Sequence, residues 1–118
     1  MDYRRLLGSE GEILALGYLQ DKGLKLMAKN YRCRLGELDL VMRNKEQVVF
    51  VEVRTKSSAA FGTGLESITL KKRTKLKLVA QQFLAHYGLQ GADLRFDIVS
   101  VCKPPFGPSV LEHVEGAF

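Results

Sequence analysis

The segment 48–55, VVFVEVRT, constrains the fold of this chain more than any other feature. Its apolar and β-branched residues are nearly continuous, which is typical of a central strand covered on both faces. Such a strand needs a packed layer on each side of its sheet. The sequence therefore predicts an α/β protein. Its 118 residues, 46% of them hydrophobic, fit one domain spanning residues 1–118 with a single core.

Hydrophobic periodicity and turn residues predict the other elements. Ser9 and Glu12 have the S-x-x-E spacing of a capping box, and Gly23 is a natural helix stop. The expected elements are helices over 9–22 and 70–87 and strands over 24–28, 36–42, 48–56, 94–102 and 110–114, with a hairpin turn at 43–46 and a loop at 57–64. Their order is αβββαβ(β). Because a crossover helix between two strands makes a parallel pair, we expect a mixed central sheet flanked by helices.

The charge balance and the isolated special residues exclude several classes of protein. The chain has 18 Lys and Arg against 13 Asp and Glu, a net charge of +5 that mildly favours an acidic partner such as nucleic acid. No apolar stretch approaches the ~20 residues of a membrane span, and no signal-peptide core follows the N-terminus. We therefore expect a cytoplasmic protein with no membrane partner. Cys33, Cys102, His86 and His113 are isolated in the sequence and are expected to be structural.

Glu52 interrupts the apolar strand, where an ionised carboxylate buried alone costs several kcal/mol. Glu52, Arg54 and Lys56 share one strand face, because side chains alternate. In a hairpin closed by an even-numbered loop, Asp39 lies opposite Glu52 or on its diagonal. Two carboxylates this close repel each other unless a cation bridges them, and Mg²⁺ accepts carboxylate oxygens. We expect a metal ion at the Asp39–Glu52 pair, with structural ion pairs to Arg54 and Lys56 as the alternative.

Two further acids stand out. Glu12 shares a helical face with the apolar residues at i+3, i+4 and i+7, so it points toward the core. It either closes the capping box with Ser9 or adds a third acid to the pair on the strands. Asp97 alternates with Arg95 on one strand face, which indicates a structural salt bridge.

A run of cations begins the second predicted helix: Lys71, Lys72, Arg73, Lys75 and Lys77. With Thr69 as the N-cap, Lys72 takes the position where a capping box places Glu. Cations in a first turn oppose the helix dipole, so a structural role alone favours acids there. Besides a solvated face, the run is typical of a phosphate-binding helix start. Arg32 and Arg34 would extend this track for backbone-directed binding of nucleic acid.

Several motifs together resemble a known family. They are GSEGE at 8–12, KNYR at 29–32, GELDLV at 36–41, VFVEVRTK at 49–56, RFDIVSV at 95–101 and the terminal GAF. GELDL followed by VFVEVR is similar to the PD-(D/E)xK pattern of restriction-endonuclease-like nucleases. The likeness covers nearly the whole chain and is closer still to the YraN family of small bacterial proteins. That family is described as predicted endonucleases distantly similar to archaeal Holliday junction resolvases.

The resemblance implies a restriction-endonuclease-like fold and a role for individual residues. Asp39 and Glu52 match the metal-binding acids of the pattern. Glu12 is similar to the first-helix Glu of resolvase-like members, and Val53 would add its backbone carbonyl as a metal ligand. A weaker likeness has Glu66 orient metal or water. In this scheme Mg²⁺ or Mn²⁺ activates water and stabilises the leaving oxygen during phosphodiester cleavage.

Arg54 departs from the pattern, which has Lys at this position. A Lys can lower its pKa and help to deprotonate water, whereas Arg stays charged and cannot. Arg54 can still clamp a phosphoryl oxygen with two hydrogen bonds. Lys56, on the same strand face, would substitute for the missing Lys by reaching back along the strand.

These residues lead to three hypotheses. The favoured one is a nuclease that binds structured or branched DNA and cleaves it with Mg²⁺ or Mn²⁺. The second is a non-catalytic nucleic-acid-binding module with the same fold, which Arg54 favours. The third is an interaction protein whose basic face meets an acidic protein. Likeness to resolvases, which cut symmetric junctions, also suggests a homodimer.

Overall fold

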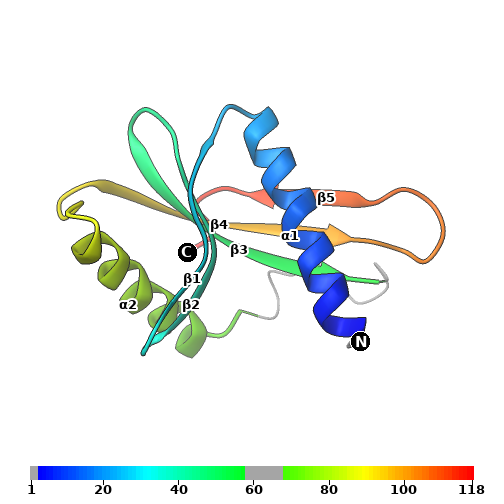
Figure 1. Cartoon of the computed structure of the whole chain (residues 1–118), viewed down its shortest axis with the longest axis horizontal. Coiled ribbons are helices and arrows are strands. Elements are labelled where there is room, and N and C mark those ends of the chain that lie inside the picture. The colour runs from blue at the N-terminus through cyan, green and yellow to red at the C-terminus, as the bar shows by residue number, and fades with distance from the viewer. Residues whose placement is uncertain (1–2, 58–67) are drawn as a thin grey trace.

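The computed structural model describes residues 3–57 and 68–118, and the elements in this part follow the predicted order. They are α1 (Tyr3–Asp21), β1 (Lys25–Cys33), β2 (Gly36–Arg43), β3 (Gln47–Lys56), α2 (Leu70–His86), β4 (Asp93–Cys102) and β5 (Val110–Val114) (Figure 1). The α/β class and the order of elements are confirmed. Glu66 and all of the predicted 57–64 loop except Ser57 lie outside the described residues.

The strands form one mixed sheet in the order β1-β2-β3-β4-β5. Only β3 and β4 pair in parallel, and α2 lies between them in the chain, as predicted. The β2–β3 register pairs Arg43 with Val48 and Leu40 with Val51, so the hairpin loop has the expected even length. The Asn44 side chain accepts two backbone hydrogen bonds and closes this turn.

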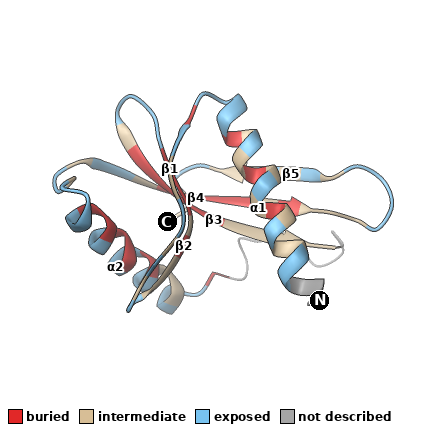
Figure 2. Cartoon of the chain, viewed as in Figure 1, coloured by how far each residue is buried: buried red, intermediate tan, exposed pale blue. Residues whose placement is uncertain are grey.

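The two helices cover opposite faces of the sheet (Figure 1). Along β3, Val48 and Phe50 pack in the same cluster as α2, whereas Val49 and Val51 pack in the same cluster as α1. Residues 48–52 are all buried, and Figure 2 shows β3 and β4 as the buried centre of the sheet. Cover on both faces is therefore the reason for the continuous apolar run.

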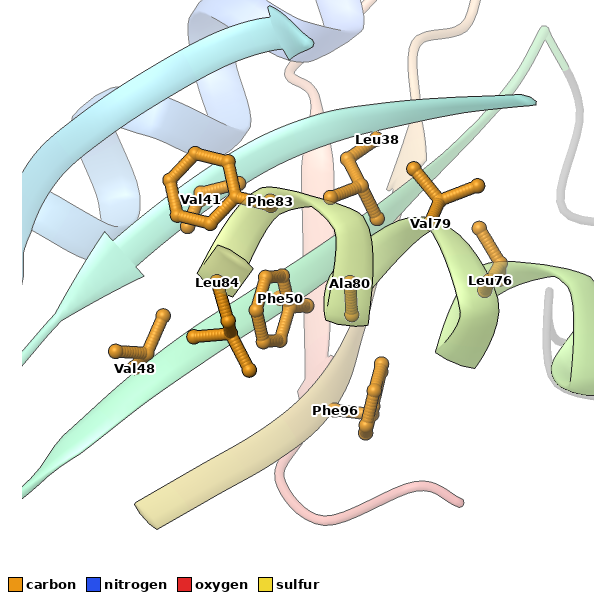
Figure 3. Packing of buried hydrophobic residues seen from close by; sticks show 10 residues of the cluster. All are labelled: Leu38, Val41, Val48, Phe50, Leu76, Val79, Ala80, Phe83, Leu84 and Phe96. Carbon is orange, nitrogen blue, oxygen red and sulfur yellow. The ribbon is translucent and has the colours of Figure 1, made fainter. Parts of the chain in front are cut away.

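Figure 3 shows the core on the α2 side of the sheet. α2 contributes Leu76, Val79, Ala80, Phe83 and Leu84, and the strands contribute Leu38, Val41, Val48, Phe50 and Phe96. The Phe50 ring stacks on Phe96 with centroids 5.3 Å apart and meets Phe83 edge-on at 5.9 Å. Each such buried side chain stabilises the fold by about 1.5–3 kcal/mol, so α2 is firmly anchored.

The first helix differs from its prediction at one end. α1 begins at Tyr3 and not at Ser9, because Arg5, Leu6 and Leu7 are good helix formers that continue it toward the N-terminus. Ser9 therefore lies inside the helix, and the capping-box interpretation of Glu12 is wrong. The other end is as predicted, since Gly23 has a positive φ of 94°. Neither described helix combines the length and the hydropathy needed to cross a membrane.

The first strand is also longer than predicted. β1 extends to Cys33 because it pairs with β2 along its length, from Lys25 opposite Arg43 to Cys33 opposite Gly36. Arg32, expected in a loop, therefore lies in a strand. Cys33 and Cys102 are half-buried free thiols, in agreement with a structural role.

Candidate functional site

Two carboxylates from neighbouring strands meet where the β2–β3 ladder ends. The last ladder pair is Leu40 with Val51, and the next position brings Asp39 beside Glu52. The two side chains are hydrogen-bonded to each other. Asp39 Oδ2 also accepts the backbone N–H of Val53 at 2.9 Å. The prediction that these acids lie close together is confirmed.

A local irregularity of the strands places Asp39 there. Leu38 and Val41, three residues apart, both pack on the α2 side, although alternation would put them on opposite faces. β2 therefore turns over between them. Neighbouring β1 has its own irregularity at Asn30, which takes a positive φ of 53°. Because Asp39 lies where β2 turns over, its carboxylate is available to the β3 amide.

The environment of Asp39 strongly favours its protonated form. Burial raises the pKa of Asp39 to about 8, with the negative charge of Glu52 as the next cause and a smaller contribution from Glu12. The Val53 N–H acts in the opposite direction. We therefore expect Asp39 to keep its proton near neutral pH, next to Glu52. A bound divalent cation would displace this proton, because metal ligands must be deprotonated.

Two cations lie beside Glu52, whose side chain is 9% exposed. Lys72 Nζ, from α2, is 2.8 Å from Glu52 Oε1, and Arg54 Nε is 3.8 Å from the same oxygen. The sequence suggested Arg54 but assigned Lys72 to nucleic acid. Thr69 caps α2 by accepting the Lys72 N–H, as predicted. A Lys where a capping box places Glu is therefore explained by the acid that it faces.

Glycine at position 11 lets α1 lie close to β3. A β-carbon on Gly11 would overlap the side chain of Thr55, so no other residue fits without a shift of the helix or the strand. This close approach brings the next residue, Glu12, near enough to the carboxylate pair for its charge to raise the pKa of Asp39. The GSEGE segment thus has a structural reason for its second glycine.

Glu12 itself is half-buried on α1. Burial raises the pKa of Glu12, the charges of Glu37 and Glu52 raise it further, and Lys29 lowers it. With its amide nitrogen turned toward the acids, Asn30 donates to Glu12 Oε1 at 2.7 Å and to Glu37 Oε1 at 3.3 Å. Sequence reasoning missed Asn30, whose only signal was its place in the KNYR motif.

The two carboxylates of Asp39 and Glu52 fit a divalent ion that keeps several water ligands better than an ion held by protein ligands alone. Within residues 3–57 and 68–118, no three His, Cys, Asp or Glu side chains are grouped so that they could hold a metal together. The expectation of three acids around one ion is corrected to a pair, with Glu12 acting at longer range. Mg²⁺ commonly binds one or two carboxylates and keeps several waters. Asp39 and Glu52, whose side chains are hydrogen-bonded to each other, suit that arrangement.

The basic start of α2 divides into two groups. Lys71 and Lys75 are exposed and available to a partner. Lys72 turns to Glu52, and the half-buried Arg73 lies with its guanidinium 5.9 Å from the Phe118 ring. The Nε atom of Arg73 is buried and has no hydrogen-bond partner in the described part of the chain. The run is therefore not simply a solvated face.

The remaining predicted site residues lie further along the strands. Arg32 forms an exposed ion pair with Glu37 at 3.3 Å. Arg34 is exposed in the turn between β1 and β2. Lys56 is half-buried at the end of β3, opposite Cys102 of β4. Arg32 and Arg34 are thus both exposed, and Arg32 is engaged by Glu37.

A second buried acid, Asp97 on β4, has a complete set of donors. Arg95 donates to both of its oxygens at 2.9 Å, His113 Nε2 lies 2.8 Å away, and Gly116 N–H donates at 3.0 Å. Burial alone raises the pKa of Asp97, but these hydrogen bonds outweigh it and lower the pKa. The predicted salt bridge with Arg95 is confirmed. His113, isolated in the sequence, is the partner that was missed, and its Nδ1 lies 2.9 Å from Lys22 Nζ.

The fold and the site define a small α/β protein that carries a hydrogen-bonded carboxylate pair beside cations from strand and helix. The family model described as "Uncharacterised protein family UPF0102" matches residues 11–101. The chain belongs to this family. The matched residues include Glu12, Asp39, Glu52 and Lys72.

Similar proteins occur in several bacteria. A UPF0102 protein of Pelotomaculum thermopropionicum is 44% identical over 118 residues, which cover 99% of this chain and 98% of the relative. One of Moorella thermoacetica is 46% identical over 98 residues, 83% of this chain and 82% of the relative. One of Legionella pneumophila is 45% identical over 95 residues, 80% of each chain.

Proposed function

We propose that this protein is a metal-dependent endonuclease of the restriction-endonuclease-like class that cleaves phosphodiester bonds in structured or branched DNA. The observation that carries the proposal is the contact between Asp39 and Glu52, with the pKa of Asp39 raised to about 8. Strongly perturbed acids with a specific charged partner are typical of functional sites. The resemblance of GELDL and VFVEVR to the PD-(D/E)xK pattern adds the reaction class.

Each acid near the site has a role in this proposal. Asp39 and Glu52 hold Mg²⁺ or Mn²⁺, and the Val53 carbonyl is a further ligand. Glu12 orients a water molecule from α1. When bound, the ion supplies an activated water and stabilises charge on the leaving oxygen.

The neighbouring cations bind phosphate rather than remove protons. A guanidinium group has donors and no acceptor, so Arg54 binds a phosphoryl oxygen and cannot act as a base. Lys56 extends the same strand face. Lys72 brings an amine to within 2.8 Å of Glu52, close to where the pattern places its Lys. The proposed site therefore keeps positive charge beside the scissile phosphate, although Arg54 stands where the pattern has Lys.

The wider surface of the proposed enzyme binds the DNA backbone. Lys71 and Lys75 contact phosphates from the exposed start of α2, where the half-buried Arg73 adds positive charge, and Arg32 and Arg34 contact them from the first hairpin. The protein acts in the cytoplasm as a two-fold homodimer on symmetric substrates. Size-exclusion chromatography with light scattering tests the dimer separately from cleavage.

Cleavage is tested on nicked, flapped and four-way DNA with Mg²⁺ or Mn²⁺. Asp39→Ala and Glu52→Gln are expected to lose cutting while they keep DNA binding. The control is Glu46→Gln, which removes one exposed carboxylate in the turn after β2 and keeps activity. Cutting that persists without Asp39 would refute the proposal.

Metal binding has its own test, because the Asp39 proton must leave. Calorimetric titration with Mn²⁺ at pH 7, in buffers of different ionisation enthalpy, is expected to show release of about one proton per bound ion. Asp39→Asn removes this release. Binding without any proton release would contradict the proposed ligand pair.

The alternative is a non-catalytic module of the same fold that binds nucleic acid. The ion pair between Lys72 and Glu52 favours it, because a protein amine already neutralises the carboxylate. This alternative predicts DNA binding that weakens steeply with salt, with neither calorimetric metal binding nor cleavage.

A further inference from the structure

A hollow of about 330 Å³ lies at the end of the sheet where β2 turns into β3. Its walls are Gly23, Lys25, Arg43, Asn44 and Lys45, all of them exposed. We call it the basic hollow, because three of these five residues are cations. Its volume is near the lower limit for pockets that bind small ligands.

The cations of the basic hollow lie close enough together to repel one another. Lys25 lies directly opposite Arg43 in the antiparallel β1–β2 pair, and like charges in that position are destabilising. All ion pairs found in residues 3–57 and 68–118 involve other cations. The exposed acids Asp21 and Glu46, nearby in the sequence, pair with none of the three in that part of the chain. An anion from outside would remove the repulsion.

The end of α1 does not require these cations. Its last carbonyls, on Tyr18, Leu19 and Gln20, already accept backbone N–H groups from residues 22–24. Asn44 is fixed by its own turn, because its side-chain oxygen accepts the N–H groups of Glu46 at 2.9 Å and Gln47 at 2.7 Å. That leaves the amide nitrogen of Asn44 as a donor at the wall of the hollow.

We propose that the basic hollow is a binding site for a phosphate group. Arg43 donates to two phosphate oxygens at once, Lys25 and Lys45 add charge, and the Asn44 amide adds a neutral donor. The site is separate from the carboxylate pair, because Arg43 lies four residues beyond Asp39 on β2, about 13 Å along the strand. The phosphate comes from a free anion or from a polynucleotide backbone, and only the second source rests on the proposed function.

The test compares Lys25→Gln/Arg43→Gln with Arg5→Gln/Lys29→Gln, which removes two exposed cations that lie outside the basic hollow and outside the start of α2. Inorganic phosphate is titrated at constant ionic strength and followed by backbone amide chemical shifts. We expect saturable shifts confined to residues 23–25 and 43–46, with affinity at least tenfold weaker in the hollow variant and within twofold of native in the control. Absence of saturable shifts, or equal loss in both variants, overturns the proposal.

A second arm uses a 12-base-pair DNA duplex in EDTA, where metal-dependent cleavage cannot occur. If the phosphate belongs to a backbone, the hollow variant binds the duplex at least fivefold more weakly and the slope of log affinity against log salt falls by about one to two. If it is a free anion, duplex binding matches the control while phosphate binding is lost. Both results are independent of whether Asp39 and Glu52 cut DNA.

A third measurement guards against failure to fold. In chloride, the hollow variant is expected to unfold at the same temperature as the native chain or higher, because a repulsion is removed. Replacing chloride by phosphate raises the unfolding temperature of the native chain and leaves that of the hollow variant unchanged. The single variant Lys45→Gln, outside the strand pair, is expected to bind phosphate about threefold more weakly. The proposed site would be refuted if Lys45→Gln bound phosphate with native affinity and phosphate raised the unfolding temperature of all the chains equally.

Discussion

Asp39 and Asp97 are the same residue type on the two strands that flank β3, yet their surroundings shift their pKa values in opposite directions. Asp97 is fully buried and accepts hydrogen bonds from Arg95, His113 and Gly116, which lower its pKa. Asp39 accepts one backbone N–H and otherwise faces Glu52, and its pKa rises to about 8. Burial raises the pKa of both acids, and the donors that surround Asp97 but not Asp39 decide the opposite direction of the two shifts.

The difference separates a structural acid from the acid that we propose binds the metal ion. The donors of Asp97 come from β4, β5 and the segment after β5, so its charge ties the end of the chain to the sheet. Asp39 instead lies in a cluster of negative charge that the protein itself only partly neutralises. Such an arrangement costs stability and is relieved by a ligand, which is typical of sites where function requires strain.

The largest effect is expected from removing the satisfied acid. Asp97→Ala leaves Arg95 and the buried His113 ring without their acceptor, so we expect a loss of about 3–5 kcal/mol in the free energy of unfolding. Urea denaturation measures it. Asp93→Ala, an exposed acid on the same strand, should change the free energy by less than about 0.5 kcal/mol. A loss below about 1 kcal/mol for Asp97→Ala would show that the hydrogen bonds of Asp97 do not stabilise the fold.

Removing the charge of Asp39 should instead increase the free energy of unfolding. The native state holds the Asp39 proton up to about pH 8, whereas the unfolded chain releases it near 3.8, so stability falls as pH rises between these values. Each pKa unit is worth about 1.36 kcal/mol, and solvent access reduces the sum. We expect Asp39→Asn to be about 2 kcal/mol more stable than native at pH 8. Urea unfolding in EDTA at pH 4 and pH 8 tests this, and an equal difference at both pH values would contradict it.

Protonation of Asp97 should contribute to the loss of stability at acidic pH. Because its pKa in the folded chain lies below the ordinary value of 3.8, its charge stabilises the fold above that value and the contribution is lost as pH falls through the folded pKa. The stability gap between native and Asp97→Asn should therefore narrow as the pH falls from 5 to 2. Thermal unfolding across that range measures the gap, and a constant gap would refute the assignment.

The smallest effect concerns the cation that partly relieves the strained pair. Lys72→Gln removes the amine beside Glu52, but the Lys72 side chain is 39% exposed, so solvent screens the interaction. We expect a loss of about 0.5–1 kcal/mol at low salt that shrinks in high salt. Lys71→Gln is the matched control on the same helix turn and should show neither change. A larger loss that is insensitive to salt would mean that Lys72 acts through packing.

Much of the fold and part of the site could be predicted because the signals are local. The nearly continuous apolar run of 48–55 indicated a strand buried on both faces, and the polar turn at 43–46 indicated the hairpin register. Together they placed Asp39 beside Glu52. The start of α1 was predicted wrongly because Ser9 and Glu12 match a capping box by spacing alone, while the residues before them also favour a helix.

By itself, the sequence determined the order of the elements, the parallel pair and the meeting of two carboxylates on adjacent strands. Only the tertiary structure decided that Lys72 faces Glu52, that Asn30 reaches Glu12, and that His113 completes the donors of Asp97. The alternation of side chains along a strand and the length of a turn depend on a few neighbouring residues, so they can be predicted from the sequence. Contacts between helix and sheet, or between β4 and β5, depend on how whole elements pack, and the packing sets which acid is neutralised and which is left strained.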